Sequence, residues 1–212
     1  MFAAPAAPGH GGAVGPKGFV STVTGLRPPV PGLKVTILGG DERMRVENRS
    51  GKTVVIEGYD GEPYLRFGPD GTYVNLRSPA TTLNEDRFGT TPVPPDADPA
   101  APPDWLLYDR RQAFEWHEHR AQWMNRKLPP SIRISPGEPR FMFEWAVPGT
   151  VDGRPLTIAG TLDYSPVTPV GSSFPWAAVA GAATVGIGVF AAGLLIAARN
   201  RDRREDEAAA AP

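Results

Sequence analysis

Short alternating segments, each ended by turn residues, occupy the chain from about residue 17 to residue 166. Leu33, Val35 and Ile37 alternate with Lys34 and Thr36, and residues 54–56 form a β-branched run. A period of two sends successive side chains to opposite faces of a strand. Many short strands separated by turns predict a mainly β fold, an immunoglobulin-like antiparallel β-sandwich.

Three further patterns refine this prediction. Residues 68–71, Gly-Pro-Asp-Gly, separate two apolar segments and predict a hairpin turn. Gly160 lies inside an inward-facing row and predicts a close approach of a neighbouring group. Two late segments predict strands with one buried face each, formed by Phe141, Phe143, Trp145 and Val147 and by Leu156, Ile158, Leu162 and Tyr164.

A long apolar run begins at Pro175 and Trp176 and ends at Ala198 without a charged residue. As a helix it would be about 36 Å long, enough to cross a hydrocarbon core of about 30 Å. Trp176 has the place of an interfacial anchor. Basic residues directly after a span predict that this end is cytoplasmic, and here they are Arg199, Arg201, Arg203 and Arg204.

These patterns predict a single-pass protein of the cytoplasmic membrane with its large domain extracytoplasmic and its C-terminus cytoplasmic. Residues 1–16 lack a basic start and an apolar core, so we interpret them as a disordered leader or signal-peptide remnant. The alternative is a tail anchor that leaves the large domain in the cytoplasm. The remaining parts are a β-sandwich at 17–166 with a Pro-rich loop at 90–104, a stalk at 167–174, the transmembrane helix at 175–198 and a cytoplasmic tail at 199–212.

Composition narrows the function classes. The formal net charge is −1, so the chain lacks the overall basic field of a nucleic-acid binder. Cysteine is absent, which excludes disulfides, a thiolate nucleophile and a Cys-based zinc site. The 25 prolines and 24 glycines argue against long helices outside the predicted span.

Residues 114–120, Phe-Glu-Trp-His-Glu-His-Arg, are the main candidate for chemistry. In an extended segment His117 and His119 share a face about 6.5–7 Å apart, which lets both imidazoles reach one metal ion, and histidine is a ligand for copper, zinc, iron and nickel. Further ligands would come from Glu115, Met124 or His10. In a helix the two rings would diverge. The competing interpretation is a pair of hydrogen-bonding histidines beside a core of Trp116 and Trp123.

Three motifs carry a family resemblance, at residues 57–67, 75–80 and 116–120. They resemble an uncharacterised family of actinobacterial exported proteins with a C-terminal membrane span. The resemblance implies no biochemical activity. Members often have another histidine near the position of Gln122, and the glutamine here weakens the metal hypothesis.

A second resemblance rests on residues 143–148, 151–154 and 160–164. They are similar to the last two strands of periplasmic copper-carrier proteins of the copper-resistance type, which have an immunoglobulin-like sandwich. Those proteins have a histidine after the Asp-Gly pair, where this chain has Arg154. Their N-terminal copper-binding histidine corresponds in position to His10.

The sequence therefore predicts a non-catalytic, membrane-anchored binding or scaffolding protein of the bacterial envelope. Its expected partners are membrane lipid and another envelope membrane protein, or a second copy through small residues of the helix, and not nucleic acid. The alternative is handling of copper or another metal through His117 and His119, with copper as the one cofactor considered. An envelope hydrolase ranks last, because no catalytic group is assembled in the sequence.

Overall fold

The computed structural model describes residues 15–166, so the apolar run at 175–198 lies outside the described part. Within residues 15–166, no helix has the length and apolarity needed to cross a bilayer. In chain order the elements are β1 (Phe19–Arg27), β2 (Leu33–Leu38), β3 (Arg43–Asn48), β4 (Val54–Glu57), β5 (Pro63–Gly68), β6 (Gly71–Asn75), α1 (Pro79–Leu83), β7 (Trp105–Asp109), β8 (Ala113–Trp116), the 3₁₀ turn η1 (His119–Ala121), α2 (Pro130–Ile134), β9 (Arg140–Val151) and β10 (Arg154–Tyr164).

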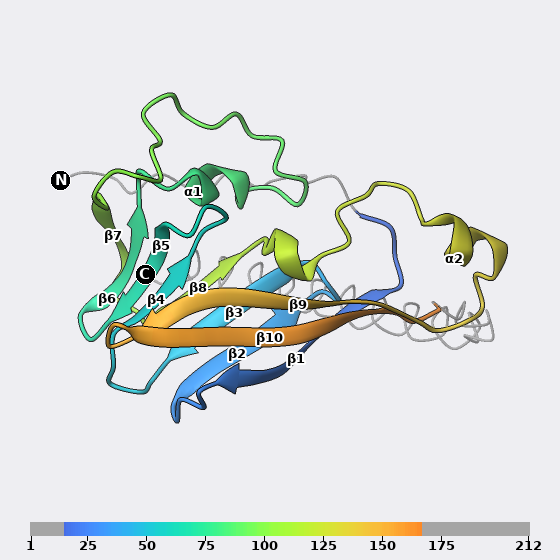
Figure 1. Cartoon of the computed structure of the whole chain (residues 1–212), viewed down its shortest axis with the longest axis horizontal. Helices are drawn as coiled ribbons and strands as arrows, with labels where there is room; N and C mark the ends of the chain where they lie inside the picture. The colour runs from blue at the N-terminus through green and yellow to red at the C-terminus, as the bar shows by residue number, and fades with distance from the viewer. Residues whose placement is uncertain (1–14, 167–212) are drawn as a thin grey trace, which may run out of the picture. The chain divides into compact units, whose positions relative to one another are not determined.

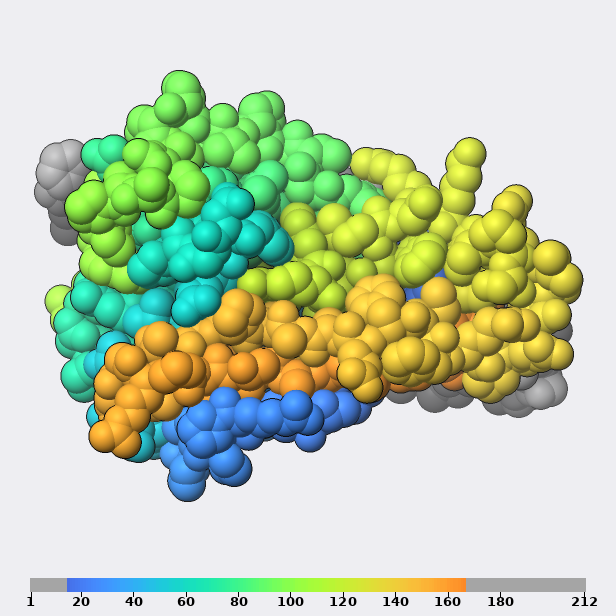
Figure 2. All heavy atoms as spheres, viewed as in Figure 1, coloured from blue at the N-terminus to red at the C-terminus, as the bar shows by residue number. Residues whose placement is uncertain are grey.

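The strands form two antiparallel sheets of unequal size (Figure 1). The large sheet has the order β1-β10-β9-β4-β5-β6-β7, and the small sheet has the order β2-β3-β8. The prediction of a mainly β fold with antiparallel sheets is confirmed, and the arrangement is consistent with a β-sandwich. Figure 2 shows the loop between α1 and β7 as an outer layer over one side of the domain.

One hydrophobic core joins the two sheets. Met44 and Val46 of β3 are fully buried, and they belong to the same cluster as Ile56 of β4 and Ile158 of β10. Trp116 of β8 is 2% exposed in that cluster. Burying a large apolar side chain contributes roughly 1.5–3 kcal/mol. Apolar burial therefore fixes the small sheet against the large one.

The local predictions for the first half of the chain hold. The segment containing Leu33, Val35 and Ile37 forms β2, and residues 54–56 lie within β4. Residues 68–71 form the turn of the β5–β6 hairpin, with Gly68 opposite Gly71. Gly71 has a φ of 145°, which L side chains rarely adopt.

The prediction for residues 141–147 is wrong at its first position. Trp145 and Val147 are buried, but Phe141 is 62% exposed. Leu162 pairs with Phe143 whereas Asp163 pairs with Phe141, so the β9–β10 register shifts by one residue at Met142. A one-residue bulge moves the following side chains to the opposite face of the sheet. The alternation therefore fails at the bulge, which the sequence pattern does not mark.

The close approach predicted at Gly160 is confirmed. A Cβ atom at this position would lie 2.1 Å from Cζ2 of Trp145 and 2.3 Å from the backbone oxygen of Thr22. The ring of Trp145 lies across the space that any larger residue would need. Gly160 thus allows β1, β9 and β10 to pack around one indole.

We expect Gly160→Ala to destabilise the domain by about 1–3 kcal/mol, because the methyl group would overpack this contact. Gly25→Ala in β1 is the matched control, since no atom lies within 4 Å of a Cβ built there. We expect its effect to be within about 0.5 kcal/mol. Urea unfolding of the 15–166 segment, followed by tryptophan fluorescence, measures both. Equal losses in the two variants would contradict the assignment.

Candidate functional site

The histidine motif begins on a strand and leaves it before the first histidine. β8 ends at Trp116, and η1 begins at His119 with Glu118 as its N-cap. Of the two geometries considered for the motif, the extended one therefore holds only as far as Trp116. The Glu118 side chain accepts a hydrogen bond from the backbone N–H of Arg120, and this cap turns the chain away from the sheet.

His117 is held against the turn between β2 and β3. Its Nδ1 lies 2.8 Å from the backbone oxygen of Glu42, and the side chain is buried. The amide nitrogen of Gln122 donates to the same oxygen. An imidazole nitrogen must carry its proton to bond a carbonyl, so Nδ1 is the donor and Nε2 is the remaining acceptor.

His119 is held by a different loop. Its Nε2 lies 2.9 Å from the backbone oxygen of Asp86, in the segment after α1. Its ring stacks on Tyr59 with centroids 5.8 Å apart. Each histidine thus uses one ring nitrogen to fasten a separate loop to the segment that follows β8.

The other proposed metal ligands lie as follows. Glu115 forms an ion pair with Arg45 at 2.9 Å, and Met124 is 38% exposed. His10 lies outside the described residues. Within residues 15–166, no group of three or more His, Cys, Asp or Glu side chains is arranged to hold a metal ion.

A buried carboxylate organises the motif instead. Glu118 is 1% exposed, and its oxygens accept hydrogen bonds from Nε1 of Trp116 at 3.0 Å and from Nε of Arg120 at 2.6 Å. A second guanidinium nitrogen of Arg120 donates to the other carboxylate oxygen at 2.9 Å. The bidentate geometry compensates a charge that would otherwise be costly to bury.

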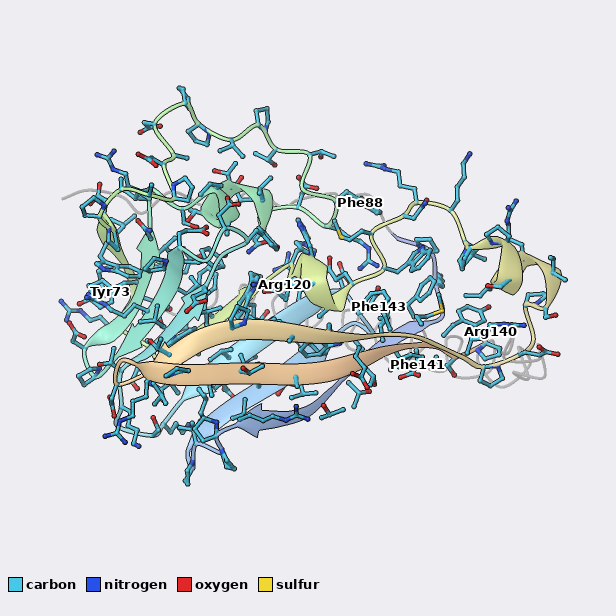
Figure 3. All side chains as sticks on the ribbon, in the orientation of Figure 1. Tyr73, Phe88, Arg120, Arg140, Phe141 and Phe143 are labelled. Atoms are coloured by element: carbon cyan, nitrogen blue, oxygen red, sulfur yellow. The ribbon has the colours of Figure 1, made fainter. Side chains whose placement is uncertain are left out.

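Arg120 links this carboxylate to the β4–β5 loop (Figure 3). Its guanidinium donates to the backbone oxygens of Glu57 at 3.0 Å and Gly58 at 3.3 Å, and it lies 5.0 Å from the ring centroid of Tyr59. The Tyr59 hydroxyl donates to the side chain of Asn84 and accepts from the backbone N–H of His119. One polar cluster therefore joins β8, the β4–β5 loop and the residue that caps α1.

The cluster also reaches the start of α1. The hydroxyl of Ser78, which caps this helix, donates to the carboxylate of Glu62. Nδ2 of Asn75 donates to the backbone oxygen of Pro63 at 2.6 Å. The structure thus brings the segments 57–67, 75–80 and 116–120 together, although they lie far apart in the sequence.

Burial sets the protonation of this cluster. It raises the pKa of the hydroxyls of Tyr59 and Tyr64 and lowers the pKa of the imidazoles of His117 and His119. Burial also opposes ionisation of Asp86. Hydrogen bonds from the backbone N–H groups of Phe88, Thr90 and Thr91 and from the Thr91 hydroxyl outweigh it and lower the pKa of Asp86 to about 2. Because the pKa of each imidazole lies below its ordinary value of 6.5, both histidines are neutral at pH 7.

A second buried ion pair lies nearby. Arg87 and Asp41 are 2.7 Å apart, with side chains 5% and 6% exposed. The Asp41 carboxylate also accepts the backbone N–H of Trp123 at 2.9 Å. This pair ties the loop after α1 to the β2–β3 turn, parallel to the histidine contacts.

The solvent-exposed candidate site is strand β7, one of the two edge strands of the large sheet. Its side chains Leu106, Leu107 and Tyr108 are 50%, 39% and 63% exposed. Within the described residues, β7 is hydrogen-bonded along one side only, to β6. The Tyr108 ring packs edge-on against Phe114 at 4.9 Å, which places the strand beside the small sheet. We call residues 105–109 the β7 edge.

An arginine-rich groove adjoins the β7 edge. It has a volume of about 660 Å³ and is lined by residues that include Arg45, Arg49, Arg110 and Arg111. Arg45 is paired with Glu47 and Glu115, and Arg111 is paired with Asp109. Within residues 15–166, Arg49 and Arg110 of the groove have no ion-pair partner, and neither has Arg43 of the neighbouring pocket. The groove therefore carries positive charge that the folded domain does not neutralise.

Sequence reasoning missed this surface. The run Trp105-Leu-Leu-Tyr108 after the Pro-rich loop has the β-favouring residues that predict a strand. Its exposure depends on its place at the edge of a sheet, which one sequence does not reveal. The net charge of −1 does not indicate a basic groove, because acidic residues elsewhere in the chain balance these arginines.

The comparisons with known proteins return nothing for this chain: no family model, no curated protein and no solved structure matches it. Both resemblances given above stay predictions.

Glu118 and Glu115 offer a matched test of the buried cluster, because each forms an ion pair with one arginine. We expect Glu118→Gln to lower the free energy of unfolding by about 2–4 kcal/mol, since it leaves the half-buried Arg120 charge uncompensated. Glu115→Gln removes an exposed pair and is expected to cost about 0–1 kcal/mol. Urea unfolding of the 15–166 segment measures both. A loss below about 1 kcal/mol for Glu118→Gln would refute the role assigned to it.

The two histidines predict a pH dependence of stability. Their pKa values are lowered in the folded domain, so the unfolded chain binds more protons just below its own histidine pKa of about 6.5. The contribution of the two neutral histidines to the free energy of unfolding is therefore fully present above about pH 6.5, and it is lost as the pH decreases below that value. We expect the melting temperature to fall between pH 7.5 and 5.5, and the fall to shrink in the double variant His117→Gln, His119→Gln. An unchanged slope in this variant would assign the effect to other groups.

Proposed function

We propose that this chain is a non-catalytic, membrane-anchored binding protein that engages an extended acidic segment of a partner protein. The observation that carries the proposal is the exposed, apolar β7 edge beside unneutralised arginines. The proposal includes an immunoglobulin-like sandwich outside the cytoplasmic membrane, held by the helix predicted at 175–198.

The β7 edge has the features of a strand-addition site. Natural sheets protect their edges because unpaired backbone groups and apolar side chains there recruit other chains. Here Leu106, Leu107 and Tyr108 remain exposed in succession. An added strand would take up the free backbone groups of β7 and cover these side chains, the mode by which several peptide-binding domains recognise extended segments.

Charge selects the class of partner. Tyr108 lines a shallow pocket together with Arg43 and Arg111, so the apolar edge and the basic groove are continuous. Arg49 and Arg110 line the arginine-rich groove described above. An acidic segment on β7 would place carboxylates beside these guanidinium groups, which favours carboxylate recognition in bidentate geometry.

The membrane anchor is supported by sequence alone. The apolar run at 175–198 has the length of a span, and the four arginines after it favour a cytoplasmic C-terminus. On this orientation the β7 edge is presented outside the cytoplasmic membrane, to other envelope proteins. The partner is therefore expected to be membrane-bound or exported.

Site-specific photocrosslinking in intact membranes tests the proposed function. A photoreactive phenylalanine analogue replaces Tyr108 in the full chain. If the anchor is present, the full chain is expected to stay in the membrane fraction after carbonate washing. We expect one adduct of defined mass, and we expect its yield to fall at least fivefold with Leu106→Lys or with the pair Arg43→Glu, Arg110→Glu. Raising the salt to about 0.5 M should also lower it, since exposed charges are screened.

The same analogue at Lys34 is the control, because Lys34 is an exposed residue of β2, the edge of the small sheet. It is expected to give no adduct of that mass. Equal adducts from both positions, or none from position 108, would contradict the role of the β7 edge. Loss of the full chain from the membrane fraction would contradict the anchor independently.

A further inference from the structure

A second surface lies at the other end of the domain, where α2 meets the ends of β9 and β10 (Figure 1). It combines exposed apolar and basic side chains. Ile134 is 82% exposed and Phe141 is 62% exposed. Arg126, Lys127 and Arg133, in α2 and the segment before it, are also exposed. We call these five residues the α2 end.

The charge of this region is one-sided. Residues 124–141 hold four basic side chains and one acidic side chain, Glu138. Glu138 is paired with Arg140 at 3.1 Å. Lys127 and Arg133 have no ion-pair partner within residues 15–166, and Arg126 lies over the ring of Phe88 at 4.3 Å. The domain as a whole is near neutral, so this end is a local concentration of positive charge.

The exposed apolar side chains of this region come from α2 and from the neighbouring strands. Phe141 is turned outward by the bulge in β9, and it shares a cross-strand row with Asp163 and Val20, which is 41% exposed. Figure 3 shows Arg140 beside Phe141 at this end. Exposed apolar side chains together with basic ones suit a surface that lies in a lipid headgroup region, where the apolar groups insert and the cations meet anionic headgroups.

The chain leaves the domain at this end. β10 ends at Tyr164, whose hydroxyl donates to the backbone oxygen of Pro136 just after α2. Ten residues separate Tyr164 from Pro175, where the predicted span begins. They reach at most about 36 Å. The β9–β10 turn lies at the opposite end of β9 from α2. The 12 residues of β9 put it about 40 Å from the α2 end.

We propose that the α2 end rests on the anionic surface of the bilayer, with Ile134 and Phe141 inserted among the headgroups. The proposal rests on the membrane anchor of the proposed function. Two contacts, the span and the α2 end, would fix the tilt of the domain. The β7 edge would then be held away from the lipid and directed sideways, toward neighbouring membrane proteins.

The absence of cysteine allows a direct test in the full chain. Single variants Ile134→Cys, Phe141→Cys and Arg154→Cys carry an environment-sensitive fluorophore and are reconstituted in vesicles of phosphatidylglycerol and phosphatidylcholine. Arg154, exposed at the β9–β10 turn, is the matched control. We expect nitroxide-labelled lipids to quench the probes at 134 and 141 at least threefold more than the probe at 154. Pure phosphatidylcholine vesicles, or Arg126→Glu with Lys127→Glu and Arg133→Glu, should abolish the difference.

Equal quenching at all three positions in chains that float with the vesicles would overturn this proposal and leave the anchor intact. A blue shift at 134 without lipid quenching, increasing with protein density, would assign the α2 end to contacts between copies and would equally overturn it. Chains that fail to float with the vesicles would refute the anchor and this proposal together.

Discussion

The buried carboxylate of Glu118 is the interaction on which the architecture around β8 depends. A charge removed from water needs a partner of opposite charge and filled hydrogen-bonding positions. Arg120 and the indole of Trp116 supply both. Because Arg120 also binds the backbone of the β4–β5 loop, satisfying one carboxylate fixes the path of two separate segments. The histidines then fasten two further loops to the same region.

This arrangement gives the polar motif a structural role. His117 and Glu118 are buried among backbone carbonyls and arginine. The exposed and unpaired groups lie elsewhere, on the β7 edge and at the α2 end. A rigid centre with chemically different surfaces at its two ends is an arrangement suited to a protein that binds at one end while held at the other.

The sequence predicted the strands well where one face is buried. The alternation at 33–38 and the glycines at 68–71 each reflect a local constraint, and both predictions hold. The prediction that Phe141 is buried is wrong, because a bulge in β9 changes the side that a residue faces without changing the local sequence pattern. The extended geometry considered for the histidine motif does not hold beyond Trp116, for another reason. Alternation continues through His119 in the sequence, but the cap formed by Glu118 depends on its own environment in the folded domain.

The candidate surfaces were beyond the sequence because exposure is a property of the assembled sheets. Leu106 and Leu107 read as ordinary core residues until β7 is known to be an edge strand. The separate arginines of β3 and of the β7–β8 turn form one groove only after folding. Pairwise neutralisation, such as that of Arg45 by Glu47, decides which of them remain available, and it too follows from tertiary structure.

The pairing of β1 with β10 has a consequence for how the chain matures. The first strand finds its neighbour in the large sheet only when the last strand has been made, more than a hundred residues later in the chain. Contacts between such distant segments carry a high entropic cost of loop closure and form slowly. The domain therefore cannot fold strand by strand from its N-terminus onward, because β1 lacks its neighbour in the large sheet until β10 has been synthesised.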